Sequence, residues 1–77
     1  MAKREEIDER TWRMVRRIAK NIRALREKRG WTQEDMENQG YAPRWYQRLE
    51  SGRYIPTLPT LDRLARTFRV GVTDLFR

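Results

Sequence analysis

Residues 30–52, GWTQEDMENQGYAPRWYQRLESG, are the stretch of this chain that decides its fold. Gly40 divides the stretch, and a glycine can adopt the positive φ that a tight turn between two helices demands. Pro43 follows closely, and proline suits the first turn of a helix because its missing N–H is not needed there. The pattern therefore predicts one helix from Thr32 to Gly40 and a second from Pro43 to about residues 51–52.

Each of these two short helices carries a capping or burial signal. The first, which we expect to run for about two turns, opens with Thr32, whose hydroxyl precedes the carboxylate of Asp35 by three residues as in a capping box. Met36 is the main inward residue of that helix. In the second helix, Tyr46 and Leu49 share a face that we expect to be buried. The opposite face carries Arg44, Gln47 and Arg48.

Two longer amphipathic helices flank this pair. Residues 8–29 and residues 57–68 place apolar side chains at steps of three and four, and Thr57 can cap the second of them. The apolar positions are Trp12, Val15, Ile18, Ala19, Ile22 and Leu25 in the first, and Leu58, Leu61, Leu64, Ala65 and Phe68 in the second. Residues 70–76 form a short, apolar fifth helix in this interpretation. We therefore expect an all-α domain of four or five short helices.

The composition excludes several functional classes. The 77 residues contain no Cys and no His, which removes thiolate metal sites, disulfides, and the usual catalytic base and nucleophile. Ser51 is the only serine, and no Lys or His lies near it in the sequence to activate it. No apolar run reaches the ~18 residues that a membrane span needs. We expect a cytoplasmic binding protein without cofactor or metal, and no enzyme.

The positive charge is concentrated in one segment. The chain has 18 Lys and Arg against 11 Asp and Glu, for a net charge of +7. Nine of the basic residues lie within residues 10–29, where Glu27 is the only acid. Two interpretations remain open at this point: a solvated helix face, or a surface that faces a polyanion, since clustered Lys and Arg attract phosphates by counterion release.

Short motifs in a fixed order connect this chain to a known family. They are residues 22–26 (IRALR), 30–36 (GWTQEDM), 48–52 (RLESG), 56–58 (PTL), 64–65 (LA) and 70–76 (VGVTDLF). From Ile18 to Phe76 the chain thereby resembles the phage-repressor/Cro (XRE-type) helix-turn-helix family. The resemblance implies a five-helix, lambda-repressor-like DNA-binding domain over residues 11–77, whose helices 2 and 3 form the helix-turn-helix. Residues 1–10 would be a charged extension that continues helix 1.

The resemblance also implies roles for individual residues. Base-reading positions on the recognition helix, about residues 43–51, fall on Pro43, Arg44, Gln47 and Arg48. Arginine suits guanine because its planar fork donates two parallel hydrogen bonds, and glutamine can do the same with adenine. Phosphate-binding positions fall on Gln33, Arg53 and Tyr54, and a structural ion pair on Arg26 and Glu50.

The function implied is sequence-specific binding of double-stranded DNA by a transcriptional regulator, a repressor acting as a homodimer on a palindromic operator. Val72, Leu75 and Phe76 are the expected dimer interface because we expect them to be exposed, with Ile7 and Trp12 as the alternative. An antitoxin with a toxin partner and a restriction-modification controller share this fold and remain alternatives. A basic helix that binds RNA or an anionic surface, or a protein-interaction module, would be a function of a different class.

Two departures from the family pattern carry structural expectations. Gln33 and Gly40 are separated by one residue fewer than is usual, which predicts a shorter turn with Tyr41 filling the gap. Arg69 stands where the family has a glycine after helix 4. A residue other than glycine at positive φ costs on the order of 1 kcal/mol, so we expect strain at this junction.

Overall fold

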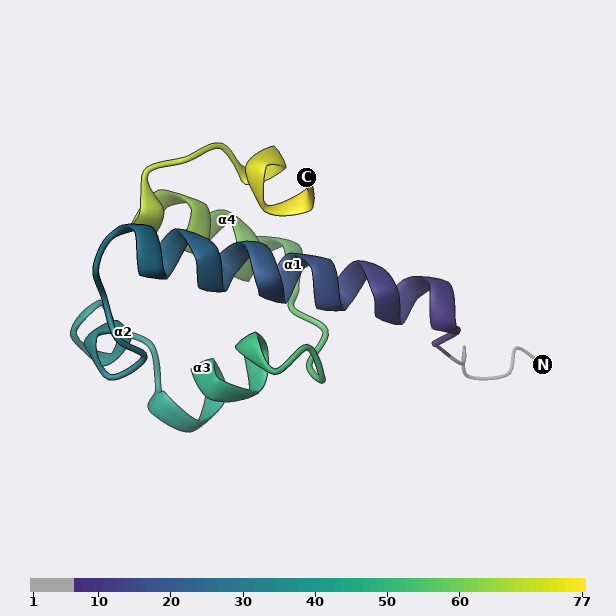
Figure 1. Ribbon diagram of the computed structural model, residues 1–77, viewed down its shortest axis with the longest axis horizontal. Coiled ribbons are helices and arrows are strands. Elements are labelled where there is room, and N and C mark those ends of the chain that lie inside the picture. Colours follow the sequence, from purple (N-terminus) through teal and green to yellow (C-terminus); the bar gives the residue numbers. More distant parts are fainter. Residues whose placement is uncertain (1–6) are drawn as a thin grey trace.

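The computed structural model describes residues 7–77. The elements are α1 (Glu9–Lys28), α2 (Asp35–Asn38), α3 (Pro43–Glu50), α4 (Leu58–Phe68) and the 3₁₀ helix η1 (Val72–Phe76), as Figure 1 shows. The described part of the chain is all-α and contains no strand, as predicted. The fifth element is a 3₁₀ helix, so the domain has four α-helices where the resemblance implied five.

The long helix α1 begins where its cap dictates. The carboxylate of Asp8 accepts a hydrogen bond from the Thr11 N–H at 2.9 Å, and the backbone of Asp8 is extended. Asp8 is therefore the N-cap, and Glu9 is the first helical residue. The remainder of the predicted N-terminal extension, residues 1–6, lies outside the described residues.

The helix-turn-helix begins with the predicted capping box. The Asp35 N–H donates to the Thr32 hydroxyl at 3.1 Å, and the Thr32 N–H donates to the Asp35 carboxylate at 2.8 Å. Gly40 then adopts φ +93° after α2, as the turn requires. The α-helical part is nevertheless a single turn, shorter than predicted, because residues 33 and 34 form a turn ahead of it.

Helix α3 meets α1 where α3 ends. Pro43 occupies its first turn, and Tyr46 and Leu49 are buried beneath it. Gly52, just beyond α3, has φ +75°, and a Cβ built there would lie 3.0 Å from Arg16 Cγ. Only glycine lets α1 approach the exit of α3 this closely.

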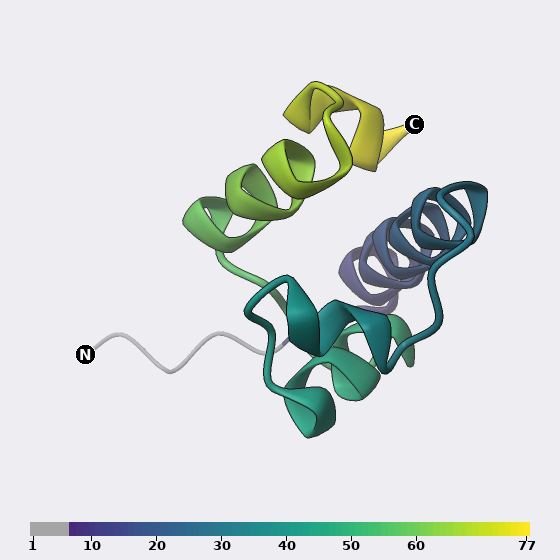
Figure 2. The ribbon, with the colours of Figure 1, turned by 90° about the vertical axis from the view of Figure 1, so that its left-hand side faces the viewer.

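Helix α1 packs beside two groups of elements, α4 with η1 and α2 with α3, which lie above and below it in Figure 1 and both to its left in Figure 2. The core formed between them contains Ile18, Ile22, Met36, Tyr41, Tyr46, Leu49, Leu61, Leu64, Ala65, Phe68 and Leu75. The burial of Tyr41 at 3% exposure agrees with its expected role in the turn. Within residues 7–77, no helix is both long and apolar enough to cross a bilayer.

Two expectations about burial are wrong. Leu58 was expected on the inner stripe of α4 but is 69% exposed. It is the first residue of α4, and helical side chains point toward the N-terminus, so it extends beyond the packed turns. Leu75 was expected to be exposed but is fully buried. Asn21 explains this, because its amide donates to the carbonyls of Leu75 at 2.9 Å and Arg77 at 2.7 Å and holds η1 against α1.

The junction between α4 and η1 contains the expected strain. Arg69 has φ 58° and ψ 46°, the left-handed conformation, and no other non-glycine residue among residues 7–77 has positive φ. This conformation lets the Val70 N–H donate to the Ala65 carbonyl at 2.9 Å and close the helix. The exposed side chain of Arg69 gains no compensating burial.

Replacing Arg69 with glycine should therefore stabilise the domain. We expect Arg69→Gly to raise the free energy of unfolding by about 1 kcal/mol, because glycine has no Cβ penalty at this φ. Urea denaturation monitored by circular dichroism measures the change. Arg69→Ala removes the same charge but keeps the Cβ, so it should leave stability nearly unchanged. Equal stabilisation by both variants would contradict the strain argument.

Candidate nucleic-acid interface

The outward face of α3 gathers the residues predicted to read bases. Arg44, Gln47 and Arg48 are all exposed, and Pro43 is exposed at the start of the helix. Their orientation is set from below, because Tyr46 and Leu49 on the opposite face are at most 1% exposed. The helix therefore presents two guanidinium groups and one amide on a rigid support.

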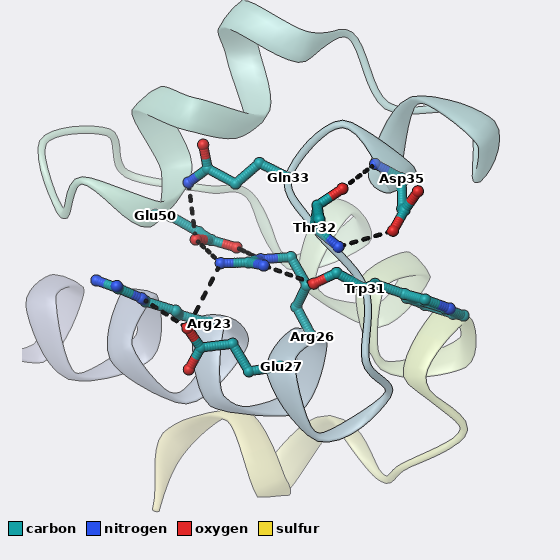
Figure 3. Close-up of polar contacts among 8 residues, drawn as sticks. All are labelled: Arg23, Arg26, Glu27, Trp31, Thr32, Gln33, Asp35 and Glu50. Atoms are coloured by element: carbon teal, nitrogen blue, oxygen red, sulfur yellow. Dashed lines mark hydrogen bonds and ion pairs between the residues drawn. The ribbon is translucent and has the colours of Figure 1, made fainter.

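A buried ion pair braces α3 against α1. Arg26 Nε donates to one carboxylate oxygen of Glu50 at 2.7 Å, and Arg26 Nη2 donates to the other at 3.2 Å. The remaining terminal nitrogen of Arg26 donates to the Trp31 carbonyl at 2.6 Å. Figure 3 shows this arrangement, which confirms that Arg26 and Glu50 form an ion pair. A guanidinium that forms a fork with a carboxylate fixes geometry as well as charge.

The electrostatics of the pair follow from its burial. The side chains of Arg26 and Glu50 are 9% and 3% exposed. Burial alone would raise the pKa of Glu50, but the hydrogen bonds from Arg26 and Gln33 outweigh it and hold that pKa below its ordinary value. The hydrogen bond with Glu50 raises the pKa of Arg26 in turn. Burial also raises the pKa of the nearby Tyr46 hydroxyl, so this group stays protonated.

Gln33 takes part in the same network. Its amide nitrogen donates to Glu50 at 3.0 Å, and its side chain is half-buried (Figure 3). Gln33 therefore joins the start of the helix-turn-helix to the end of α3. One of its two N–H groups is engaged in this bond, and contact with a DNA phosphate stays a prediction. The neighbouring α2 is a single turn, so its dipole adds little attraction for an anion.

An aromatic row, which was not predicted from the sequence, runs beside the outward face of α3. Tyr41 stacks on Trp45 with ring centroids 5.9 Å apart, and Trp45 meets Tyr54 edge-on at 5.7 Å. The guanidinium of Arg48 lies over the Tyr54 ring at 5.9 Å. Tyr54 thus supports a predicted base-reading side chain. The aromatics at positions 41 and 45, four residues apart, were the available signal.

The other predicted residues divide between two regions. Arg53 is exposed in the loop after α3, adjacent to the recognition face. The predicted dimer residues of η1 lie on the opposite side of α1 from α3 (Figure 2). Of these, Phe76 is 42% exposed, Val72 is half-buried, and Leu75 belongs to the core. Among residues 7–77 there is no group of carboxylates that could hold a metal ion.

Known proteins share this architecture. A family model described as a helix-turn-helix domain matches residues 17–76. The uncharacterized HTH-type transcriptional regulator y4dJ of Sinorhizobium fredii (strain NBRC 101917 / NGR234) is 35% identical over 63 residues, which are 80% of this chain and 82% of that protein. The crystal structure of the hypothetical transcription factor NHTF from Neisseria is similar with a TM-score of 0.75 and 27% identity, over 100% of this chain and 87% of that one.

The chain belongs to the helix-turn-helix family of DNA-binding domains. This membership confirms the resemblance drawn from the motifs. It also confirms the expectation that the protein is not an enzyme, because the family is one of transcriptional regulators.

The Arg26–Glu50 brace makes stability depend on acid pH. Because the pKa of Glu50 is lowered in the folded state, its stabilising contribution is present above its unfolded value of 4.5 and is lost as pH falls below that. Glu50→Gln should cost about 3 kcal/mol at pH 7, since Arg26 is left buried without its counter-charge, and should remove this part of the acid sensitivity.

Chemical denaturation across pH 3–7 measures both effects. Glu9→Gln is the matched control, because it breaks an exposed ion pair with Arg16 and should change stability by less than about 0.5 kcal/mol. A Glu50→Gln variant as stable as the parent, with the same loss of stability in acid, would show that the pair does not brace the fold.

Proposed function

We propose that this protein is a sequence-specific transcriptional regulator, a repressor, that binds double-stranded DNA with α3 in the major groove. The observation that carries the proposal is the exposed face of Arg44, Gln47 and Arg48 on a helix held rigidly from beneath by Tyr46 and Leu49. The printed names of y4dJ and of NHTF, a transcriptional regulator and a transcription factor, support it.

The chemistry of this face suits base edges. The major groove is wide enough for an α-helix, and each base pair presents there a distinct pattern of donors and acceptors. Arg44 and Arg48 can each donate in parallel to guanine O6 and N7, and Gln47 can match adenine N6 and N7. Arg53, in the loop beyond the helix, is placed to contact a phosphate and fix register without reading sequence.

The experiment that tests the proposal begins with selection of binding sites from random duplex DNA. Affinity is then measured for a panel of single-base variants of the best site. Arg44→Ala and Arg48→Ala should each cost roughly 1–3 kcal/mol on the best site and relax the preference at one or two base pairs. Arg53→Ala should weaken binding to all sequences about equally and lower the salt slope by about one.

All three side chains are exposed, so each variant should remain folded, which circular dichroism checks. If the ranking of site variants is the same for Arg44→Ala, Arg48→Ala and the parent protein, these arginines do not read bases. If no sequence is enriched at all, sequence-specific binding itself is wrong.

We further propose that the protein acts as a homodimer on a site with two-fold symmetry. Paired helix-turn-helix domains place their recognition helices one turn of DNA apart, about 34 Å, and so double the contacted sequence. With Leu75 in the core, Phe76 and Val72 are the apolar side chains that η1 offers to a partner copy. Ile7, which is 42% exposed, together with Trp12 provides the alternative surface, at the N-terminal end of α1.

Sedimentation equilibrium distinguishes these surfaces. The parent protein should be dimeric at tens of micromolar, and Phe76→Asp should shift it to monomer because a carboxylate is costly in an apolar interface. If the Ile7→Asp variant is monomeric and the Phe76→Asp variant is still dimeric, the dimer interface lies at the N-terminal end of α1. A parent protein that is monomeric both with and without its selected DNA would refute the dimer.

A further inference from the structure

The outer face of α1 carries a row of positive charges that the recognition helix does not use. Arg13, Arg17, Lys20 and Lys28 follow one another at steps of four, three and eight residues, with Ala24 in the gap. All five are exposed. Residues at such steps lie above one another on a helix, so the four cations form one stripe, which we name the α1 cationic stripe.

The stripe faces away from the core. The buried residues of α1 are Val15, Ile18, Ala19, Ile22 and Arg26, and the helical periodicity puts the stripe on the opposite side. Figure 2 looks toward the end of α1 and shows α3 below it and α4 with η1 above it and to its left. The stripe and the outward face of α3 are therefore turned toward different sides of the domain.

The stripe also differs from Arg16 and Arg23 of α1 in its surroundings. Arg16 is paired with Glu9, and Arg23 with Glu27, on the side of α1 that is nearer to α3. Within residues 7–77, no carboxylate forms an ion pair with any member of the stripe. A shallow crevice that includes Arg13, Arg17 and Lys20 leaves these groups open to a ligand.

The surroundings of the stripe indicate the class of ligand. A membrane-bound helix needs an apolar face free to enter the lipid, but the apolar face of α1 is buried in the domain. A specific protein partner is held by a central cluster of apolar or aromatic anchors. The stripe contains only Ala24 between its charges, and Met14 is a single exposed apolar side chain beside it, so there is no such cluster here. A phosphate backbone needs neither, because it is a regular line of negative charges.

The length of the stripe fits this ligand. Fifteen residues separate Arg13 from Lys28, about 22 Å along a helix, and each strand of duplex DNA carries one phosphate per ~3.4 Å of its axis. We propose that the α1 cationic stripe is a second nucleic-acid-binding surface, which holds the phosphate backbone of a duplex without regard to sequence and independently of α3.

The test uses a protein in which α3 has been disabled. In an Arg44→Ala/Arg48→Ala background, binding to a 20-bp duplex of random sequence is measured by fluorescence anisotropy over a range of salt concentrations. Adding Arg17→Gln/Lys20→Gln should weaken this binding and make the slope of log K against log salt shallower by about two. Glutamine is a good helix former, so the fold should be preserved.

The matched control is Arg66→Gln/Arg69→Gln, on α4 and just beyond it. It removes the same number of exposed positive charges, so any effect of net charge alone is equal in the two variants. The control should leave the slope within about half a unit of the background protein. The same slope change in both variants, or in neither, overturns the proposal.

Poly-L-glutamate serves as the second probe, because it offers carboxylates in place of phosphates. Loss of poly-L-glutamate binding in the stripe variant, with duplex binding intact, would assign the surface to an acidic protein and overturn the proposal. The test of the stripe is independent of the test of the proposed function. If the parent protein shows no sequence preference, base reading by α3 is refuted, and the measurement on the stripe variant is unaffected.

Discussion

The fork between Arg26 and Glu50 is the contact on which the geometry of this domain depends. It joins the last turn of α1 to the last turn of α3, and Gln33 and the Trp31 carbonyl close the network around it. The segment between these two helices is irregular apart from the single turn of α2. Without the fork, apolar contacts would hold α3 near α1 but would not determine its rotation, because hydrophobic attraction is non-directional.

The relation between the two helices is reinforced at a second point. Gly52 permits contact with Arg16, ten residues before Arg26 on the same helix. Two contacts so far apart on α1 define the pitch of α3 more tightly than either could alone. Helix α4 holds the turn before α3 in the same way. The guanidinium of Arg63 on α4 lies 4.5 Å from the centre of the Tyr41 ring and donates to the Gly40 carbonyl.

Much of this arrangement could be predicted from the sequence, because it depends on local rules. Periodicity identified the buried faces of α1, α3 and α4, and cap chemistry identified Thr32 and Thr57. The motif order identified the Arg26–Glu50 pair, whose members are 24 residues apart. Leu58 and Leu75 were misjudged because periodicity says which side a residue occupies, and only the tertiary packing of the helix ends says whether that side is covered.

The candidate site could also be predicted in part from the sequence. The exposure of Arg44, Gln47 and Arg48 follows from their positions opposite Tyr46 and Leu49. The role of Tyr54 beneath Arg48 and the bond from Gln33 to Glu50 required coordinates, because both join segments whose relative placement no local pattern encodes. The length of α2 was overestimated for a related reason, since a capping box marks where a helical segment starts and does not determine how soon regular hydrogen bonding follows.

The brevity of the helix-turn-helix has a consequence for how this protein folds and persists. Isolated helices shorter than about 12–15 residues are marginal in water, and α2 and α3 have four and eight residues. Neither is stable without its packing against the rest of the core, so the recognition surface and the global fold form one cooperative unit. A partly unfolded chain therefore offers no residual version of this surface, and any ligand that engages α3 must also protect the whole domain from proteolysis by mass action.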